Sequence, residues 1–438
     1  MRFQALRGTT DILPEQVRRW SHVEHTARRL ARLYGYQELR TPLIEETALF
    51  LRSVGETTDI VQKEMFRFED RGGHDIVLRP EGTASVVRAY LEHHLDKTQG
   101  FAKLFYLGPM FRAERPQAGR FRQFHQYGVE AIGSASPWVD VEVILLCVRI
   151  LEACGITGAS VWLSSLGCRN DQARSAEALR KRLLPARSAL CKECQDRLEK
   201  NVFRVLDCKQ PGCRERGWAG GSPFLLCDAC TAHLEEVKQG LAAAKIAFDD
   251  TKVFARGLDY YTRTVFEVRS AGLGAQDAVA AGGRYDHLVE ELGGPSVGAV
   301  GFAAGIERIL LASGQDRQPA QPAQKRHGVY LAIAKPALIA EGFRLLEQLR
   351  ERQVDAAMAY DGRSLKAQLR EADKAGVRFV AILGEEELTQ RAMTLKDLEQ
   401  GSQRTVPLDA FVEGVAKLLV SDTAAGVRHQ GCGIRHQP

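Results

Sequence analysis

The chain has 438 residues, of which 45% are hydrophobic and 26% are charged, as in ordinary globular proteins. This length exceeds what one hydrophobic core supports, so we expect two or three domains. No apolar run approaches the roughly 20 residues that span a bilayer, and the first residues contain no secretory signal, so we expect a cytoplasmic protein with no membrane partner. The net charge of +5 permits a nucleic-acid partner without requiring one.

The first predicted element is an amphipathic helix near the N-terminus. Asp11 can act as its N-cap, Pro14 suits the first turn, and Gly35 is placed to end it. A short extended stretch, residues 37–40, then runs into Thr41-Pro42.

Residues from about 60 to 135 predict short strands joined by turns and one helix at 83–93, and a second helix is expected after them at 138–153. The strands are expected at residues 66–68, 76–78, 104–107 and 124–132. The last two form an antiparallel pair, and its connecting loop carries Arg112, Arg115, Arg120 and Arg122.

Residues from about 171 to 250 are rich in Arg, Lys, Glu, Leu and Cys, which predicts a small helical insertion. Strands are expected again at 253–255, 265–268 and 279–281, before a glycine-rich strand and helix over 298–311. A linker of Gln, Pro and Ala follows at 315–325.

After the linker the pattern alternates between strands and helices. Strands are expected at 329–334, 355–360 and 379–383, and helices at 337–352 and 365–375. Such alternation is typical of a small α/β domain with a largely parallel sheet. The tail beyond about 425 is expected to be disordered.

A nucleotide-binding loop of the common glycine-rich kinds is absent from the sequence. No G-x-x-x-x-G-K-S/T segment occurs, and Gly272-Leu273-Gly274 lacks the third glycine of a dinucleotide fingerprint because residue 277 is Asp. If a nucleotide binds, arginine is the natural substitute, because its planar fork binds phosphate oxygens in a bidentate way.

Four short segments carry the residue order of three known motifs. Residues 108–116 read Gly-Pro-Met-Phe-Arg-Ala-Glu-Arg-Pro, and residues 120–126 read Arg-Phe-Arg-Gln-Phe-His-Gln. Taken alone, this would be a solvated basic loop, but the order resembles motif 2 of the class II aminoacyl-tRNA synthetases. Residues 301–309, Gly-Phe-Ala-Ala-Gly-Ile-Glu-Arg-Ile, resemble motif 3, and Thr41-Pro42 resembles the weaker motif 1 of the dimer interface.

Three further segments narrow the resemblance to the histidyl-tRNA synthetases. Residues 256–262, Arg-Gly-Leu-Asp-Tyr-Tyr-Thr, resemble the first histidine motif of that family, and residues 281–286, Ala-Gly-Gly-Arg-Tyr-Asp, resemble the second. Residues 79–83, Arg-Pro-Glu-Gly-Thr, match its substrate loop. The resemblance runs in the family's order from Gly8-Thr9 to at least Leu311.

The resemblance implies an α+β catalytic domain with an antiparallel sheet (the class II synthetase fold), a helical insertion and a C-terminal α/β anticodon-binding domain. We expect the first part of the catalytic domain, with motifs 1 and 2, at residues 1–170 and the cysteine-rich insertion at 171–250. The second part of the catalytic domain, with the histidine motifs and motif 3, is expected at 251–318. The anticodon-binding domain is expected at 319–425 and a tail at 426–438.

The implied activity is that of a histidine–tRNA ligase, working as a homodimer. It would activate L-histidine with ATP and Mg²⁺ to histidyl-adenylate and pyrophosphate, and then transfer histidine to the 3′-terminal adenosine of tRNA(His). The alternative is a non-catalytic paralogue that serves as the regulatory subunit of ATP phosphoribosyltransferase. That paralogue typically loses the arginine of the first histidine motif and the C-terminal domain, whereas Arg256 and a full C-terminal α/β unit are present here.

The resemblance also assigns roles to single residues. Arg112 and Arg256 are the catalytic cations expected around the α-phosphate. The histidine-binding residues would be Glu81, Gly82, Thr83, Arg112, Gln126, Glu130, Arg256, Tyr260, Tyr261 and Tyr285. The ATP-binding residues would be Arg112, Glu114, Arg120 and Arg308. Gln117 and Arg122 would contact the tRNA acceptor end.

The cysteines leave two alternatives open. Cys191-x-x-Cys194 and Cys227-x-x-Cys230 have the spacing of a structural zinc site with four thiolate ligands, and Cys208 or Cys213 could contribute. The other interpretation is uncoordinated thiols, because the gap of 32 residues between the pairs is long and the insertion of this family generally has no zinc. Cys147 and Cys154 are expected in the core.

Overall fold

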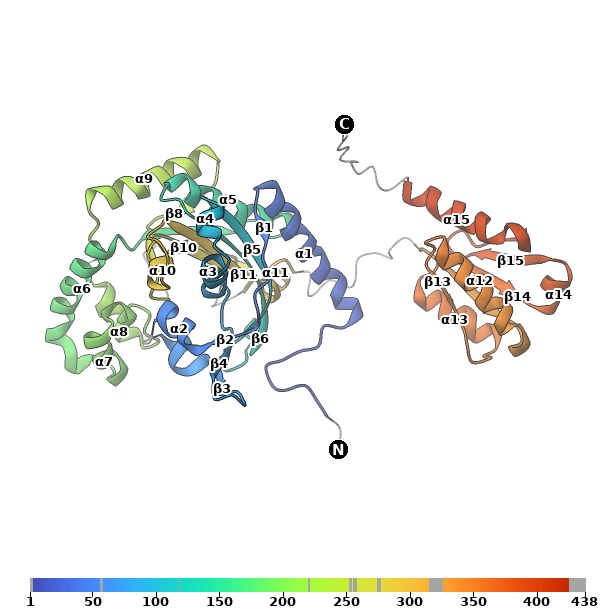
Figure 1. The fold of residues 1–438 in the computed structure, drawn as a ribbon, viewed down its shortest axis with the longest axis horizontal. Coiled ribbons are helices and arrows are strands. Elements are labelled where there is room, and N and C mark those ends of the chain that lie inside the picture. The colour runs from blue at the N-terminus through green and yellow to red at the C-terminus, as the bar shows by residue number, and fades with distance from the viewer. Residues whose placement is uncertain are drawn as a thin grey trace. The chain divides into compact units, whose positions relative to one another are not determined.

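The computed structural model describes residues 3–55, 58–117, 119–219, 221–251, 254, 258–273, 277–314 and 326–424. The chain divides into two compact units, residues 1–318 and 319–438 (Figure 1). Within the described residues, no helix is both long and apolar enough to cross a membrane.

The first unit is built on an eight-stranded sheet with the order β1-β5-β6-β11-β10-β9-β7-β8. The six central strands, β5-β6-β11-β10-β9-β7 in sheet order, pair antiparallel with their neighbours. The outermost pairs, β1–β5 and β7–β8, are parallel. The sheet is therefore antiparallel over its centre, as predicted. Its strands are β1 (Gln37–Glu38), β5 (Ala102–Phe111), β6 (Gln123–Ile132), β7 (Ser160–Ser165), β8 (Phe248–Asp249), β9 (Thr262–Arg269), β10 (Ala278–Arg284) and β11 (Ala299–Gly305).

A three-stranded antiparallel sheet of β2 (Ile44–Glu46), β4 (Asp75–Leu78) and β3 (Phe66–Glu69) leads into helix α3 (Thr83–Glu92). The turn from β4 into α3 carries the Arg79–Thr83 segment. The short elements of this unit are α2 (Thr47–Val54), η1 (Ile60–Glu64), α4 (Leu95–Thr98), η4 (Ala271–Leu273) and α10 (Leu288–Glu291).

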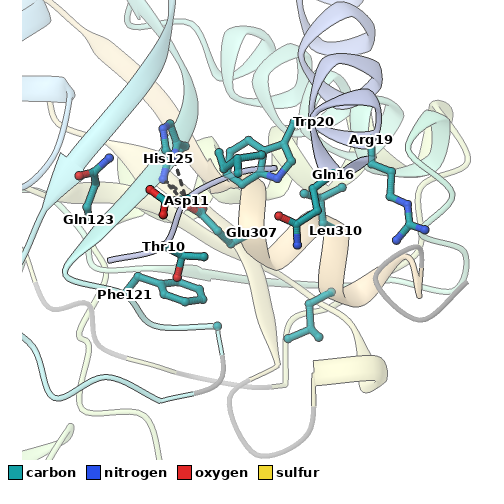
Figure 2. A pocket seen from close by; sticks show the side chains of 13 residues that line it. Thr10, Asp11, Gln16, Arg19, Trp20, Phe121, Gln123, His125, Glu307 and Leu310 are labelled. Atoms are coloured by element: carbon teal, nitrogen blue, oxygen red, sulfur yellow. Dashed lines mark hydrogen bonds and ion pairs between the residues drawn. The ribbon is translucent and has the colours of Figure 1, made fainter. Parts of the chain in front are cut away.

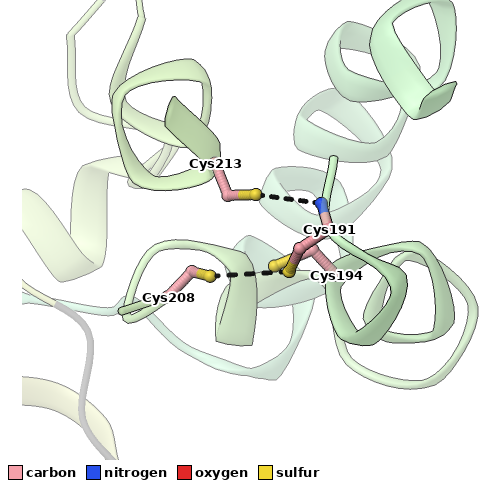
Figure 3. A group of neighbouring side chains, drawn as sticks. All are labelled: Cys191, Cys194, Cys208 and Cys213. Carbon is pink, nitrogen blue, oxygen red and sulfur yellow. Dashed lines mark hydrogen bonds between the residues drawn. The ribbon is translucent and has the colours of Figure 1, made fainter. Parts of the chain in front are cut away.

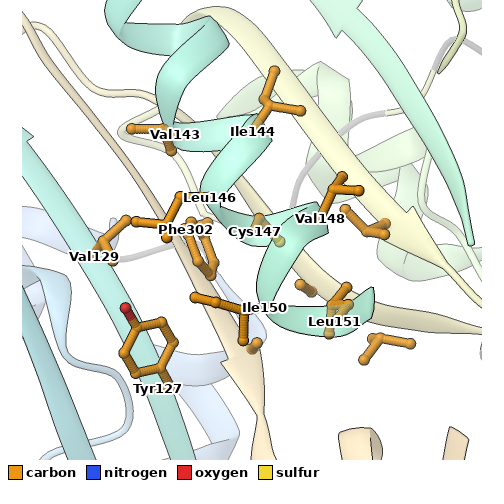
Figure 4. Packing of buried hydrophobic residues seen from close by; sticks show 14 of the residues in the cluster. Tyr127, Val129, Val143, Ile144, Leu146, Cys147, Val148, Ile150, Leu151 and Phe302 are labelled. Carbon is orange, nitrogen blue, oxygen red and sulfur yellow. The ribbon is translucent and has the colours of Figure 1, made fainter. Parts of the chain in front are cut away.

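The main core lies between helix α5 (Pro137–Ala153) and the central strands (Figure 4). Leu146 and Ile150 on α5 are buried with Tyr127 and Val129 of β6 and Phe302 of β11. Helices α1 (Pro14–Leu33) and α11 (Ile306–Ala312) add to the same cluster. Cys147 and Cys154 are buried in it, which confirms their predicted place in the core.

Between β7 and β8 the described chain is helical. Its longest helices, α6 and α9, stand at the two ends of this stretch, and α9 packs on α5. The elements are α6 (Arg169–Leu183), η2 (Leu184–Ala189), α7 (Lys192–Lys200), η3 (Val202–Val205), α8 (Pro211–Trp218) and α9 (Asp228–Ala243).

The second unit has a five-stranded sheet with the order β13-β12-β14-β15-β16. β12 pairs in parallel with β13 and β14, but β14–β15 and β15–β16 are antiparallel. The three predicted strands thus pair in parallel as expected, but β15 and β16 were not predicted. Their antiparallel pairing makes the sheet mixed rather than largely parallel, because β16 returns from β15 through a turn too short for a parallel crossover. The elements are β12 (Val329–Ile333), η5 (Pro336–Leu338), α12 (Ile339–Glu351), β13 (Ala356–Met358), α13 (Leu365–Ala375), β14 (Phe379–Leu383), α14 (Glu385–Thr389), β15 (Ala392–Asp397), β16 (Ser402–Pro407) and α15 (Leu408–Ala424).

One local prediction differs from the structure, and two others are not tested by it. The N-cap of α1 is Leu13 rather than Asp11, and the backbone amide of Leu13 donates to Gln16 Oε1 at 3.1 Å. Pro14 thus occupies the first helical position, where its missing amide costs nothing. Of the strand predicted at 253–255, residues 253 and 255 lie outside the described residues, as does the predicted tail beyond 425.

Candidate active site

Glu81 lies at the start of α3 with its carboxylate buried. The backbone amides of Thr83 and Ala84 donate to its two oxygens at 2.7 and 2.9 Å. Glu81 therefore satisfies two of the amide groups that the first turn of a helix leaves without helical partners. Burial raises the pKa of this carboxyl above its usual range.

Arg79 fixes the loop in front of α3 to the two neighbouring segments. Its Nη1 donates to Thr41 Oγ1 at 2.8 Å and its Nε to the carbonyl of Pro109 at 3.0 Å. Gly108 admits the guanidinium, since a Cβ there would lie 2.7 Å from Arg79 Nη2. The Thr41-Pro42 segment is thereby held against the hairpin of β5 and β6.

Glu130, on β6, is the most deeply buried acid of the site, with 1% of its surface exposed. Thr83 Oγ1 donates to its Oε1 at 2.7 Å, and the hydroxyl of Tyr285 donates to its Oε2 at 2.5 Å. Burial raises the pKa of Glu130 to about 8, against the pull of these two hydrogen bonds.

Three glycines make room for these side chains. Gly301 of β11 pairs with Glu130 across the strands, and a Cβ at Gly301 would lie 2.0 Å from Glu130 Oε2. Gly82 and Gly128 flank the buried ring of Tyr106, and a Cβ on either would lie 2.3 Å from its Cζ. The site therefore needs glycine at these positions for close packing. Gly82, predicted to bind histidine, packs against Tyr106 and is not among the residues that line the cavity. Tyr106 and Gly301 were not predicted as site residues. Their roles depend on the residues opposite them in the sheet, Gly128 and Glu130, which the sequence does not show.

A group of tyrosines forms one wall of the site. Tyr260 and Tyr261 have ring centroids 4.8 Å apart, and Tyr285 stands edge-on to Tyr260 at 5.9 Å. The neighbouring Arg284 is completely buried, and its Nε lies 2.8 Å from Asp140 Oδ1 on α5. This ion pair fixes the backbone that presents Tyr285 to the carboxylate of Glu130.

These side chains surround a cavity of about 160 Å³. Most of the predicted histidine-binding residues line it, namely Glu81, Thr83, Arg112, Gln126, Glu130, Tyr260, Tyr261 and Tyr285. Within the described part of the chain, Oε1 of Gln126 is buried without a hydrogen-bond partner, so it is an acceptor available to a donor in the cavity. Arg256 lies outside the described residues.

A larger cleft of about 620 Å³ adjoins this cavity. It is lined by all the residues predicted to bind ATP, namely Arg112, Glu114, Arg120 and Arg308. Arg120 Nη1 pairs with Glu114 Oε2 at 2.8 Å, and Arg308 Nε donates to the carbonyl of Ala278 at 2.7 Å. Burial and the charge of Arg120 lower the pKa of Arg308, so a bound anion would relieve the repulsion between the two guanidinium groups.

Further charged residues of the cleft were not predicted. Glu267, Arg269 and Asp277 lie on its wall, where Arg269 pairs with Glu267 at 2.6 Å and with Asp277 at 3.1 Å. Asp207 and Arg214 reach the same cleft from the helical insertion. No local motif marks any of these residues, because they come together only in the folded chain.

Arg112 lines both the small cavity and the large cleft, and so does Gln126. The Nε of Arg112 donates to the carbonyl of Pro80 at 2.9 Å, and its guanidinium lies over the ring of Phe124 at 5.2 Å. A cation is thus held at the boundary between the small cavity and a cleft that is lined by four more arginines, Arg120, Arg214, Arg269 and Arg308. This is where an acid group in the cavity would meet a phosphate in the cleft.

The two residues predicted to contact an acceptor end occupy different settings. Gln117 lies exposed at the tip of the β5–β6 loop, where its amide donates to the carbonyl of Arg120 at 3.2 Å. Arg122 is half-buried at the base of the loop, and its amide donates to the carbonyl of Gly8 at 2.7 Å. A Cβ on Gly8 would lie 2.8 Å from Arg122 Cγ, so the N-terminal segment packs closely on this arginine.

Another cavity, of about 360 Å³, lies between the N-terminal segment, α1, β6 and α11 (Figure 2). The backbone amide of His125 donates to both carboxylate oxygens of Glu307, at 2.9 and 3.0 Å, and Trp20 stands edge-on to the imidazole at 4.8 Å. Asp11, which was expected to cap α1, lines this cavity instead. The His125–Glu307 contact joins β6 to α11 and so holds the two arginine motifs together.

The cysteines do not form the predicted set. Cys191 and Cys194 lie with Cys208 and Cys213, whereas Cys227 and Cys230 lie with Cys168 and Asp171. The prediction of one site made of Cys191, Cys194, Cys227 and Cys230 is therefore wrong. The C-x-x-C spacing correctly placed the two cysteines of each pair together. Which further residues join each pair depends on how the helices between the pairs fold, and the spacing does not specify this.

Comparisons with known proteins cover both units. The family model described as "Histidyl-tRNA synthetase" matches residues 8–201 and 226–309, and the model described as "Anticodon binding domain" matches residues 328–418. The histidine–tRNA ligase of Desulfitobacterium hafniense (strain DSM 10664 / DCB-2) is 46% identical over 429 residues, which cover 96% of this chain and 100% of the relative. That of Syntrophotalea carbinolica is 44% identical over 425 residues, covering 97% and 99%.

Among solved structures, the apo histidyl-tRNA synthetase of S. aureus matches with a TM-score of 0.78 and 33% identity over 95% of this chain and 100% of that one. The antiparallel sheet, the arginine-bearing hairpin and the glycine-rich strand that leads into α11 are the fold of a class II aminoacyl-tRNA synthetase, followed by a separate anticodon-binding domain. Because the matches extend over nearly the whole chain, it belongs to the histidyl-tRNA synthetase family.

The clearance at Gly301 predicts a selective binding defect. A Cβ there would displace the Glu130 carboxylate and crowd the carbonyl of Val129 at 2.3 Å, an overpacking that costs about 1–3 kcal/mol. We expect Gly301→Ala to weaken histidine binding at least tenfold in calorimetry, with ATP binding changed less. Gly100→Ala, whose Cβ would meet nothing within 4 Å, is the control. Unchanged histidine affinity in the folded Gly301→Ala variant would contradict this account.

The raised pKa of Glu130 predicts a pH-dependent stability difference. Between pH 4.5 and about 8 the folded chain keeps a proton that the unfolded chain has released, so this carboxyl lowers the free energy of unfolding as the pH rises through that window. Glu130→Gln should therefore gain stability relative to the parent from pH 5 to pH 8, by up to about 1.4 kcal/mol per pH unit.

Urea denaturation followed by tryptophan fluorescence measures this difference. All four tryptophans, Trp20, Trp138, Trp162 and Trp218, lie in the first unit, so the signal reports the unit that contains Glu130. Glu351→Gln, an exposed change in the second unit, is the control and should leave the fluorescence transition unaltered. Parallel curves for Glu130→Gln and the parent across this pH range would refute the assignment.

Proposed function

We propose that this chain is a histidine–tRNA ligase that activates histidine with ATP and transfers it to tRNA(His). The observation that supports it best is the shared boundary of the two cavities, where Arg112 and Gln126 belong to both. One cavity has the size and polar groups for an amino acid with an imidazole. The other is lined with arginines for a triphosphate, in a chain without a glycine-rich phosphate loop.

Histidine recognition falls to the buried acids and the tyrosines. Glu130 meets the imidazole, and Tyr260 and Tyr261 enclose its other side. Glu81 and Thr83 take the ammonium, together with Oε1 of Gln126, which has no hydrogen-bond partner among the described residues. A site that hydrogen-bonds both ring nitrogens rejects other amino acids by roughly 10⁴–10⁵, because a wrong side chain leaves buried groups unpaired.

In the first reaction, a carboxylate oxygen of histidine attacks the α-phosphorus of ATP in line. The bond to the β-phosphate oxygen breaks, and histidyl-adenylate and pyrophosphate form. Arg112 and Arg256 stabilise the charge on the α-phosphate, while Arg120 and Arg308 bind the β- and γ-phosphates. No protein nucleophile takes part, so the rate depends on positioning and on fixed positive charge.

Magnesium accompanies ATP in class II synthetases, where it screens the charge of the phosphates when bound. The chemistry of the cleft fits such an ion, because Glu114 and Glu267 line it and carboxylate oxygens are the ligands that Mg²⁺ prefers.

In the second reaction, a ribose hydroxyl of the 3′-terminal adenosine attacks the carbonyl carbon of the adenylate. The ester bond forms, AMP leaves, and the hydroxyl proton is released. Gln117, at the exposed tip of the β5–β6 loop, and Arg122, at its base, contact the acceptor end. The second unit, which matches the anticodon-binding model, binds the anticodon.

The regulatory-subunit alternative is less well supported. Arg256 is present in the sequence, and residues 328–418 match the anticodon-binding model, a domain that such a paralogue lacks. The charged cleft beside the amino-acid cavity would also be unnecessary in a protein that makes no adenylate.

Pyrophosphate exchange tests the proposal directly. Among the twenty amino acids, we expect histidine alone to sustain exchange of label between pyrophosphate and ATP. Arg112→Ala and Arg256→Ala should each reduce the exchange at least about 100-fold, the usual cost of losing a group that stabilises transition-state charge. Arg115→Ala, an exposed arginine of the same loop outside both cavities, is the matched control. Near-normal exchange in folded Arg256→Ala would remove that residue from the mechanism.

We further propose that the chain works as a homodimer in the cytoplasm. Several large apolar side chains are exposed on and beside α1 and β2, namely Leu13, Val17, Leu33, Leu43 and Ile44. This is the region of motif 1, which the family uses for its dimer interface. The described cysteines are all free, as is usual in a reducing compartment.

Light scattering after gel filtration should give twice the chain mass of 48.5 kDa. Ile44→Glu places a charge in the proposed interface and should yield the single-chain mass. Phe343→Glu, an equally exposed apolar position in the second unit, should remain dimeric. A parent protein that elutes with the single-chain mass at micromolar concentration would exclude the dimer.

A further inference from the structure

Four cysteines of the insertion point toward one another from three separate segments (Figure 3). Cys191 and Cys194 lie at the start of α7, Cys208 follows η3, and Cys213 lies on α8. Their Sγ atoms are all within 4.8 Å of one another, and three of the four residues are at most 3% exposed.

The distances within this group suit a metal ion rather than a disulfide. Sγ of Cys191 lies 3.8 Å from Sγ of Cys208, nearly twice the length of a disulfide bond. Four sulfurs bound tetrahedrally to zinc at about 2.3 Å stand about 3.8 Å apart by simple geometry. The backbone also donates to these sulfurs: the amide of Cys191 lies 3.2 Å from Cys213 Sγ, and that of Gln210 lies 3.4 Å from Cys208 Sγ. Such donors stabilise the thiolate form that binds a metal.

The local fold explains why a metal would be needed. The segment from η2 to α8 contains two 3₁₀ helices, of 6 and 4 residues, and two α-helices, of 9 and 8 residues. Elements this short bury little apolar surface, and small structures of this kind are generally held by disulfides or metals. Buried free cysteine is common by itself, but it does not explain the convergence of four sulfurs from three segments.

A second group joins the two ends of the insertion. Cys168 and Asp171 stand at the start of α6, and Cys227 and Cys230 at the start of α9, with one ligand atom of each within 4.8 Å of the others. Asp171 is completely buried beside these thiols: the amide of Cys227 donates to its Oδ1 at 3.1 Å, the amide of Cys168 donates to its Oδ2 at 3.3 Å, and Arg174 pairs with it at 2.6 Å.

We propose that the insertion binds two zinc ions, one through Cys191, Cys194, Cys208 and Cys213, the other through Cys168, Asp171, Cys227 and Cys230. Thiolate-rich tetrahedral sites favour zinc among the divalent ions, and the thiols release their protons as the metal binds. The first ion holds α7, η3 and α8 together, and the second closes the insertion where it leaves and rejoins the catalytic unit.

The first ion also acts on the cleft, on the basis of the proposed function. Asp207 precedes the ligand Cys208, Arg214 follows the ligand Cys213, and both line the cleft assigned to ATP. Loss of this ion would release that part of the wall, so the KM for ATP should rise several-fold while histidine affinity changes less.

Metal analysis of the purified full chain tests the two sites without reference to activity. Inductively coupled plasma mass spectrometry should find about two zinc ions per chain, and protein stripped with a chelator should take up two equivalents of Zn²⁺ alone. Zinc below a tenth of an equivalent, without uptake by the stripped protein, would overturn both sites. Iron with the visible absorption of an iron–sulfur cluster would overturn the assignment to zinc.

Single substitutions separate the two sites. Cys208→Ser should remove one zinc and Cys168→Ser the other, whereas Cys147→Ser, a buried core thiol outside both groups, should retain two. Full zinc in Cys208→Ser would overturn the four-cysteine site, and full zinc in both Cys168→Ser and Asp171→Asn would overturn the second. If a serine variant does not fold, the number of thiols in the native parent that react with a thiol reagent, before and after chelation, gives the same answer. Protection of the ligand thiols only while zinc is bound supports the sites, and equal reactivity contradicts them.

The metal result and the proposed function can fail independently. A chain that holds two zinc ions but shows no histidine-dependent exchange would keep the sites and refute the ligase. A chain that exchanges normally without zinc would do the reverse.

Discussion

The buried carboxylate of Glu130 constrains the rest of the active site. A carboxyl with 1% exposure is costly unless its oxygens are hydrogen-bonded, and both are, by Thr83 from α3 and by Tyr285 from the end of β10. The carboxyl fits only because β11 has no side chain at Gly301. One acid on β6 thus fixes the positions of α3, β10 and β11 around the cavity.

A buried ion pair between Arg284 and Asp140 connects the active site to the helices packed behind the sheet. Arg284 and Asp140 form an ion pair with both side chains at 0% exposure, and Asp140 also meets His233 of α9 at 2.6 Å. Breaking such a pair by removing one partner leaves an uncompensated buried charge, which costs about 3–5 kcal/mol. The loop that presents Tyr285 is therefore tied to α5 and, through α9, to the insertion.

The sequence predicted those parts of the site that lie on continuous segments. The arginine hairpin, the Glu81–Thr83 turn and the strand before α11 are local patterns, so their residues could be named before their neighbours were known. Contacts between distant segments could not be predicted in this way. The clearance at Gly301 depends on strand register, and the β15–β16 hairpin was not predicted. The cysteine pairs were found by spacing, but their partners were wrong, because the fold of α7, α8 and α9 decides which sulfurs meet.

The insertion is therefore part of the catalytic unit rather than an appendage. It leaves the central sheet after β7 and returns at β8, so both of its ends are fixed by the sheet that carries the site. Between those ends, Asp207 and Arg214 reach the cleft that Arg112 and Arg308 also line. A cleft that binds phosphates with arginines, rather than with backbone amides of a glycine-rich loop, depends on where each guanidinium is held. Whatever fixes the insertion therefore also fixes part of the electrostatic field in which ATP would bind.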